Sequence, residues 1–269
     1  MTSLPHLQDV LAKKTERMPV LFIGHGSPMN AIEDNRYSQG WRQAAEKIPT
    51  PKAILSVSAH WETDGTFVTA METPKTIHDF GGFPKALFDA QYPAPGSPAY
   101  AKETADTVRK TTVGLDDTWG LDHGTWSVLM QMYPKAEIPV FQLSLDATKA
   151  PEYHYNLAKE LRALRDRGVL ILGSGNIVHN LRMMRFDGKM YDWAPEFDAK
   201  MKQFMEKADD QSVVHYEKLG TVANYAVPTN EHFLPLLYVL GARDNKEKPQ
   251  FFNDILDMGS ISMRSVRFG

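Results

Sequence analysis

Short apolar runs alternate with segments of helical periodicity along this chain. The runs are rich in aliphatic and β-branched residues, which predicts strands buried on both faces at residues 19–24, 52–60, 138–145 and 168–175. Apolar positions three and four residues apart predict helices at residues 37–48, 98–112, 124–133, 151–168, 195–210 and 230–240. This alternation predicts an α/β fold with a central, mostly parallel sheet flanked by helices.

A turn signal indicates that the sheet is mixed. Asp64 and Gly65 stand between two strand-like runs, and this dipeptide favours a type I′ hairpin. We therefore expect an antiparallel hairpin beside the parallel strands.

The composition is typical of one globular domain. The 269 residues are 42% hydrophobic, which is enough to bury one sizeable core. We expect a single domain at residues 19–269, preceded by an N-terminal extension at residues 1–18.

The charge and the apolar segments limit where the protein works. The formal net charge of -3 comes from nearly balanced acids and bases, which argues against nucleic-acid and membrane-surface partners. The N-terminus lacks the apolar core of a secretory signal, and the apolar run at residues 233–242 is too short to span a bilayer. We expect a cytoplasmic protein, either a monomer or a small homo-oligomer.

Four histidines are placed where a ligand crevice would form. His25, His60 and His179 each end or follow a predicted strand, and His232 lies near the start of the last predicted helix. Because the carboxyl ends of strands in an open α/β sheet form one crevice, we expect these imidazoles to converge.

A metal site explains these histidines better than ordinary core packing does. His25 stands between two glycines, which lets backbone and ligand approach closely. Strand alternation would place Ser56, Ser58 and His60 on one face, an unusual polar run for a core. The chain has no cysteine, so disulfides and thiolate ligands are excluded. Imidazoles suit Zn(II), Fe(II), Cu and Ni, and the residues do not select among them.

Three other kinds of site are disfavoured by their motifs. The chain has no HExxH pattern for a zinc protease and no serine within G-x-S-x-G for acyl transfer. The segment "GSGNIV" has Val178 where a dinucleotide-binding loop needs its third glycine.

Several motifs, taken together, resemble those of a known family. The segments are "GHGSPMNAIEDN", "ILSVSAHWET", "IHDFGGFP", "YPAPGSP", "GLDHGTW", "PVFQLSLD", "ILGSGNIVHNLR" and "PTNEHFLPLLYVLGA". In this order and spacing they resemble the class III extradiol ring-cleaving dioxygenases, most closely the 4,5-DOPA dioxygenase extradiol group. The resemblance extends from about Pro19 to the C-terminus and makes residues 19–269 the expected catalytic domain.

The resemblance implies a metal ion held by His25 in "GHGSP", His60 in "SAHWET" and His232 in "NEHFLP". His179 in "GNIVHNL" matches the acid/base residue beside the metal, and in zinc-loaded members it also counts as a fourth ligand. Activity is expected to need one non-haem Fe(II), and Zn(II) can occupy the same site.

Two further residues qualify this assignment. His123 in "LDHGTW" matches an active-site histidine that contacts substrate or oxygen intermediates. Classical members of the superfamily use two histidines and a carboxylate, so Glu231, beside His232, is the alternative third ligand.

The activity implied by the resemblance is insertion of O2 into a small catechol. For the group that matches most closely, the substrate is 3,4-dihydroxyphenylalanine (DOPA), opened between carbons 4 and 5 to a seco-DOPA that cyclises to betalamic acid. Two alternatives from other classes stay open at this point. A zinc hydrolase would use the same histidines to activate water, and a non-catalytic protein would bind metal without turnover.

The remaining histidines are weaker candidates. His78, in "IHDFGGFP", fits a substrate loop and a structural turn equally well, and the same holds for its neighbour Asp79. His6, His154 and His215 lie in a tail or on helix-like segments, where surface or packing roles are expected.

Overall fold

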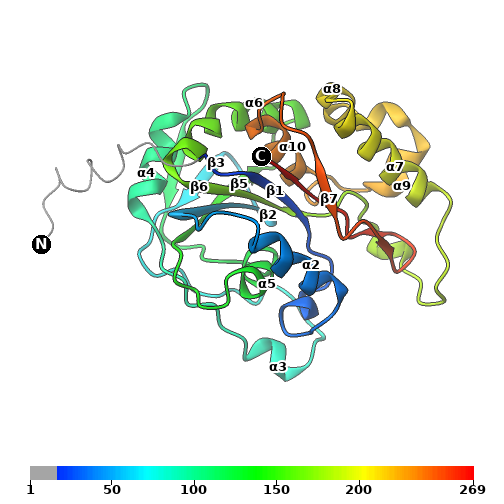
Figure 1. Ribbon diagram of the computed structural model, residues 1–269, viewed down its shortest axis with the longest axis horizontal. Helices are drawn as coiled ribbons and strands as arrows, with labels where there is room; N and C mark the ends of the chain where they lie inside the picture. The colour runs from blue at the N-terminus through cyan, green and yellow to red at the C-terminus, as the bar shows by residue number, and fades with distance from the viewer. Residues whose placement is uncertain (1–16) are drawn as a thin grey trace, which may run out of the picture.

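Eight strands form the central sheet of the computed structural model, which describes residues 17–269 (Figure 1). Their order across the sheet is β4-β3-β5-β2-β6-β1-β10-β7, and β8 and β9 form a separate ribbon. The bounds are β1 Val20–Gly24, β2 Ala53–Thr63, β3 Thr66–Thr69, β4 Val113–Asp116, β5 Val140–Asp146, β6 Val169–Gly175, β7 Gln250–Phe252, β8 Leu256–Asp257, β9 Ile261–Ser262 and β10 Ser265–Phe268.

The centre of the sheet is parallel, and both sides of it are mixed. β2 pairs in parallel with β5 and β6, and β6 pairs in parallel with β1. β10 runs antiparallel to β1 and β7, while β3 runs antiparallel to β5. The four predicted strands are these central ones, so the predicted α/β class with a mostly parallel, mixed sheet is confirmed.

The hairpin predicted at Asp64 and Gly65 is wrong in its pairing. The turn exists, and Gly65 has a φ of 94°. However, β5 lies between β2 and β3 in the sheet, and β3 pairs with β5 through Val68 and Leu143. The register of β2 against β5 shifts between Val57 and Glu62. After the turn, the chain forms β3 on the far side of β5 and does not pair with β2.

Helices flank the sheet at the predicted places, with some changed ends. The bounds are α2 Arg36–Ala45, α3 Lys85–Phe88, α4 Pro98–Thr107, α5 His123–Met132, α6 Pro151–Leu161, α7 Trp193–Glu206, α8 Asp210–Val214, α9 Thr221–Ala226 and α10 Leu234–Ala242, with short 3-10 turns η1 Pro28–Ala31, η2 Arg162–Arg167, η3 Leu181–Met183 and η4 Tyr216–Leu219.

Two of the changed helix ends affect the sheet and the histidines. The helix predicted at residues 98–112 ends at Thr107, and the chain continues into the unpredicted strand β4. The last helix begins at Leu234 because Pro235, which favours a first helical turn, sets its start. His232 therefore lies in the loop before α10 and not on the helix.

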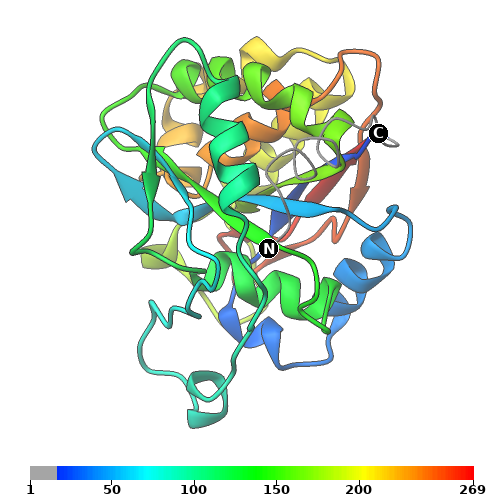
Figure 2. The same ribbon diagram turned by 90° about the vertical axis from the view of Figure 1, so that its left-hand side faces the viewer.

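The helices make two layers, one on each face of the sheet (Figures 1 and 2). α4, α6, α7 and α10 pack on one face, and α2 and α5 pack on the other. Successive residues of β1 enter opposite cores: Val20 and Phe22 face the first layer, and Leu21 and Ile23 face the second. All four are fully buried, as expected of a central strand between two layers.

Two further expectations concern the N-terminal extension and membrane spans. Most of the predicted extension at residues 1–18, with His6, lies outside the described residues, so a boundary at residue 18 stays a prediction. Within residues 17–269, no helix has the length and apolar character needed to cross a bilayer.

Candidate metal centre

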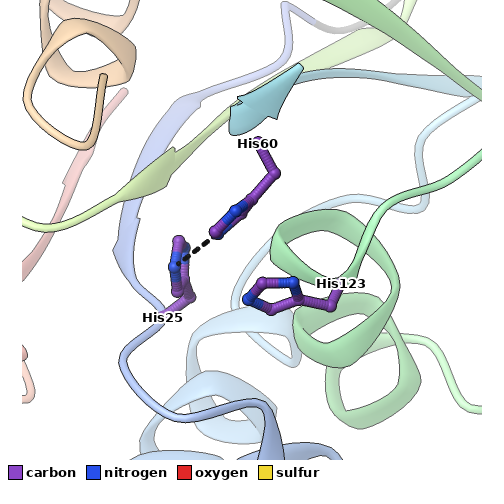
Figure 3. Close-up of side chains that lie close together, drawn as sticks. All are labelled: His25, His60 and His123. Atoms are coloured by element: carbon purple, nitrogen blue, oxygen red, sulfur yellow. Dashed lines mark hydrogen bonds between the residues drawn. The ribbon is translucent and has the colours of Figure 1, made fainter. Parts of the chain in front are cut away.

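Three histidine side chains converge at one edge of the central strands (Figure 3). His25 comes from the end of β1, His60 from β2 and His123 from the first turn of α5. The Nε2 atoms of His25 and His60 are 3.2 Å apart. The ligand atoms of His25, His60 and His123 all lie within 4.8 Å of one another.

His25 is placed by close contacts around the end of β1. Its backbone N–H donates to the carbonyl of Gly175, at the end of β6. A Cβ on Gly24 would lie 2.7 Å from backbone atoms of Met263, so only glycine fits before this histidine. The glycine beside His25 is therefore needed for the approach of another backbone segment.

His60 stands where β2 is irregular. The register of β2 against β5 shifts between Val57 and Glu62, and such an irregularity redirects the side chains within it. Ser58, on the polar face noted in the sequence, donates to the Asp122 carboxylate at 2.6 Å. Asp122 also caps α5 by accepting from the backbone N–H of Thr125. The polar face of β2 thus holds the start of the helix that carries His123.

His232 and His179 form the other side of the site. The carbonyl of His232 accepts from the backbone N–H of Asn176, just after β6, which anchors the loop before α10. The rings of His179 and His232 stack with centroids 3.5 Å apart. The ligand atoms of His179, Glu231 and His232 lie within 4.8 Å of one another.

The three predicted metal ligands form a nearly regular triangle. Their ring centroids are 5.1 Å apart for His25 and His60, 5.2 Å for His25 and His232, and 5.0 Å for His60 and His232. Two ring nitrogens on one tetrahedral ion lie about 3.3 Å apart, given metal–nitrogen bonds of about 2.05 Å. The 3.2 Å between the Nε2 atoms of His25 and His60 matches that spacing.

The hydrogen bonds of the outer ring nitrogens set the tautomers. The Ser174 hydroxyl donates to the carbonyl of Gly124 at 2.5 Å, so it accepts from Nδ1 of His25 at 3.0 Å. Nδ1 of His232 lies 3.0 Å from the Glu231 carboxylate, and Nδ1 of His60 lies 3.5 Å from Asp79. Nδ1 of His25 and Nδ1 of His232 therefore carry the ring proton of these two histidines.

The Nε2 atoms of His25 and His232 consequently have free lone pairs. Nε2 of His60 lies 3.2 Å from Nε2 of His25, a distance at which it donates a hydrogen bond in the metal-free protein and at which both nitrogens can bind one metal ion. Serine and carboxylate groups that fix ligand tautomers are the usual surroundings of a metal-bound histidine. The residues present therefore fit a single metal ion.

Burial keeps these histidines neutral. Burial, assisted by the neighbouring imidazoles, holds the pKa values of His25 and His232 well below their usual range. Burial is also the main cause that lowers the pKa of His60 to about 3 and that of His179 to about 4. Neutral imidazoles are the form that binds metals, so the site is ready for a cation at neutral pH.

Asp79 is shared between two of the histidines. It accepts from the backbone N–H and from Nδ1 of His123, both at 2.9 Å, and lies 3.5 Å from Nδ1 of His60. Burial acts to raise the pKa of this carboxyl, but the hydrogen bond and charge of His123 lower it overall. The sequence left Asp79 undecided because its loop has no periodicity that would show which way it faces.

The other histidines have ordinary partners. A ring nitrogen of His78 lies 2.9 Å from the carbonyl of Ala90, so this residue holds the loop before α3. His154 is buried against the Tyr238 hydroxyl, as a packing residue. His215 is partly exposed, within 3.5 Å of Glu217.

A cavity of about 470 Å³ opens beside the five clustered histidines. Its other walls are mainly apolar and are formed by Pro28, Phe80, Phe83, Leu181, Met184, Met258 and Ile261. This volume suits a small organic molecule. The sequence did not single out the last four of these residues, because they come from loops and a short ribbon that meet only in the folded protein.

The fold and the site together define a class of protein. A cysteine-free α/β sheet carries a group of neutral histidines at its carboxyl edge, beside an apolar cavity for a small molecule. This arrangement is that of a metal-dependent enzyme with a mononuclear site and room for an aromatic substrate.

Comparison with known proteins identifies the family. Residues 19–269 match the family described as the catalytic LigB subunit of aromatic ring-opening dioxygenase, and the chain belongs to this family. A protein of Escherichia coli (strain K12) named 4,5-DOPA dioxygenase extradiol is 48% identical over 98% of this chain and 99% of its own length. The protein of that name from Beta vulgaris is 40% identical over 92% of this chain and 95% of its own length.

A solved structure shows the same fold. An uncharacterized protein from Escherichia coli K12 superposes with a TM-score of 0.82 at 43% sequence identity, covering 94% of this chain and 100% of that chain. The predicted family is confirmed, and the protein is an extradiol ring-cleaving dioxygenase that depends on a metal. This assignment decides against the zinc hydrolase and the non-catalytic binding protein.

Proposed function

We propose that this enzyme opens the ring of DOPA between carbons 4 and 5, giving a seco-DOPA that cyclises to betalamic acid. The observation that carries the proposal is the cluster of histidines beside an apolar cavity, in a chain similar to proteins named 4,5-DOPA dioxygenase extradiol. The cavity volume of about 470 Å³ is large enough for one aromatic ring, and its apolar walls suit the face of that ring.

In this proposal Fe(II) is held by Nε2 of His25, His60 and His232. When bound, the ion supplies open positions for the catechol and O2 and a path for electrons between them. Ser174 and Glu231 leave the Nε2 lone pairs of His25 and His232 free for the ion by accepting from their Nδ1 atoms, and the Asp79 carboxylate lies 3.5 Å from Nδ1 of His60.

His179 acts as the acid/base residue. It is neutral at pH 7 because burial lowers its pKa to about 4, so it can accept the proton of a catechol hydroxyl and return it later. In zinc-loaded protein the ring nitrogen of His179 that would accept the proton can instead serve as a fourth metal ligand. The His179 ring stacks on the ring of His232, so it lies near enough to the metal site for either role.

In this proposal His123 also contacts the substrate. Because Asp79 holds the proton of its Nδ1, its Nε2 faces the cavity. From this position the His123 ring contacts the substrate oxygens or the oxygen intermediates, and the hydrogen bonds to Asp79 fix its orientation. The apolar walls of the cavity keep bulk water from the reacting groups.

Oxygen uptake with a chromogenic product tests the function. The metal-free protein is reconstituted with Fe(II) without oxygen, mixed with L-DOPA and then exposed to air. We expect oxygen consumption together with a yellow product, and neither with zinc-loaded protein. Oxygen consumption with simpler catechols but not with L-DOPA would remove DOPA as the substrate, and no consumption with any catechol would contradict the proposed activity.

A further inference from the structure

The cavity beside the histidines has no partner for a charged substituent of the catechol ring. Among the described residues that line it, Asp79 is the only ionisable side chain apart from the histidines, and it is engaged with His123. A carboxylate buried against the remaining apolar walls would lose its hydration without compensation. A substrate that carries an amino acid group must therefore place that group elsewhere.

A second, smaller cavity adjoins the first. Its volume is about 220 Å³, and His179 and Leu181 form part of the wall of both cavities. Unlike the first cavity, it brings a cationic and an anionic side chain together, Arg182 and Glu231. These two charges match the carboxylate and the ammonium of an amino acid.

The guanidinium of Arg182 is available for a carboxylate. Arg182 lies on η3, three residues after His179, and its side chain is exposed. Within residues 17–269, no hydrogen bond or ion pair engages it. By contrast, the side chain of Arg185, two residues after η3, donates to the carboxylate of Asp187 at 2.7 Å. A free guanidinium beside a substrate cavity can bind a carboxylate through two parallel hydrogen bonds.

Glu231 has a free acceptor for an ammonium. The hydroxyl of Thr229 and Nδ1 of His232 both lie 3.0 Å from Oε1. Oε2 has no hydrogen-bond partner among the described residues, and the side chain is 21% exposed. The charge of Glu231 also reaches Glu62, whose pKa is raised by burial and then by this neighbour. The Glu231 carboxylate in the cavity lining therefore has one oxygen free to bind a cation.

We propose that this second cavity is the binding subsite for the amino acid group of the substrate, with Arg182 on the carboxylate and Oε2 of Glu231 on the ammonium. The inference rests on the proposed DOPA dioxygenase function and deepens it by assigning the residues that recognise the α-amino acid group of the substrate. The ring lies in the first cavity, and the side chain passes between His179 and Leu181.

A panel of four catechols separates the two charges. L-DOPA carries both groups, dopamine lacks the carboxylate, 3,4-dihydroxyphenylpropanoate lacks the ammonium and 4-methylcatechol lacks both. For the wild-type enzyme we expect the lowest KM for L-DOPA. The Arg182→Gln variant should lower the ratio of kcat/KM for L-DOPA to that for 4-methylcatechol by about 10- to 100-fold, the usual effect of losing a hydrogen bond to a charged group.

The control and rescue variants lie on the same segment. Arg185→Gln removes an equal charge outside the cavity and should leave the ratio as in the wild type. Arg182→Lys keeps the charge without the two parallel donors and should restore part of the ratio. The ratio for dopamine against 4-methylcatechol should not change in Arg182→Gln, because dopamine has no carboxylate.

A binding measurement keeps the inference separate from the proposed activity. Zinc-loaded protein is titrated anaerobically with L-DOPA in a calorimeter, and Arg182→Gln should weaken binding about 10- to 100-fold. An unchanged Kd together with an unchanged substrate ratio would overturn the subsite. A wild-type enzyme that consumes no catechol would instead overturn the proposed function, while the titration would still decide the role of Arg182.

Discussion

The outer nitrogen of each predicted ligand has its own partner, and these partners differ in kind. Nδ1 of His25 donates to a serine, that of His232 to a carboxylate next in sequence, and that of His60 lies near a shared carboxylate. Because the Nδ1 atoms of His25 and His232 donate to these partners, their Nε2 atoms keep lone pairs for a metal ion. At the scale of single residues, the site is thus organised for a cation before any ion binds.

The two roles of His179 can be separated by substitution. We expect His60→Ala to lose the metal, because it removes one corner of the ligand triangle. His179→Gln should keep much of the metal and lose most of the turnover, because the proton acceptor is gone while three ligands stay. Metal content by mass spectrometry and oxygen uptake measure the two effects. If His179→Gln loses as much metal as His60→Ala, His179 is a ligand and not the base.

Asp79 provides a test of the shared carboxylate. Asp79→Asn removes the charge that accepts from Nδ1 of His123 and lies 3.5 Å from Nδ1 of His60, so zinc affinity should fall about 10- to 100-fold. The measurement is competition with a chelator, together with ¹⁵N NMR of the imidazoles to read their tautomers in the metal-free protein.

The matched control for this prediction is Asp187→Asn. Asp187 is exposed and paired with Arg185, away from the site. Its loss should leave both the affinity and the tautomers as in the wild type. Equal zinc affinity in Asp79→Asn and in the wild type would rule out the positioning role.

At the scale of elements, the site depends on how closely strand ends approach other segments. β1 ends against the backbone of Met263, just before β10, and a Cβ on Gly175 would lie 2.1 Å from the carbonyl oxygen of His232. Glycine at these two strand ends lets β1 and β6 carry the loops of His25 and His232 into one place. The irregularity in β2 turns His60 toward the same place.

Gly24 is the position where this close approach can be tested. Gly24→Ala forces its Cβ to within 2.7 Å of the Met263 backbone, which must shift. We expect a loss of about 1–3 kcal/mol in the free energy of unfolding, measured with urea on metal-free protein, and weaker zinc binding. Gly81→Ala is the control, because no atom lies within 4 Å of its added Cβ. A Gly24→Ala protein as stable as the Gly81→Ala protein would show that the Met263 backbone, just before β10, shifts without loss of stability.

For the whole molecule, the buried histidines link stability to pH. The folded protein keeps them neutral: burial lowers the pKa of His60 to about 3, and those of His179 and His154 to about 4. The unfolded chain protonates them near their ordinary value of about 6.5. Protons therefore bind the unfolded state first as the pH falls, and the folded state loses stability.

The expected result is a metal-free protein that is most stable above pH 6.5. Its free energy of unfolding should decline between pH 6.5 and about pH 4, by up to about 1.4 kcal/mol per pH unit for each such histidine. Urea denaturation at pH 7, 6 and 5 measures the slope. His154→Gln removes one of these histidines away from the metal site and should flatten the slope. Constant stability from pH 7 to pH 5 would contradict the linkage.

The central elements follow from local pattern. The four central strands carry short, largely apolar runs because both of their faces are covered, and that signal survives without knowledge of the partners. The strands β4 and β7 to β10 are short, and most lie near the edges or in the small ribbon, so their sequences carry little periodicity. The hairpin prediction failed because a turn dipeptide says how the chain bends and not which strand it meets next.

The sequence by itself determined the α/β class, the central strands and the histidines at their ends, because apolar runs and the residues that interrupt them are local properties. Only the tertiary structure decided that β5 separates β2 from β3, that Asp79 serves two histidines, and that Arg182 and Glu231 share a cavity. These facts depend on contacts between segments far apart in the chain. The physical reason is that burial leaves a periodic trace in the sequence, whereas a hydrogen bond between two loops leaves none.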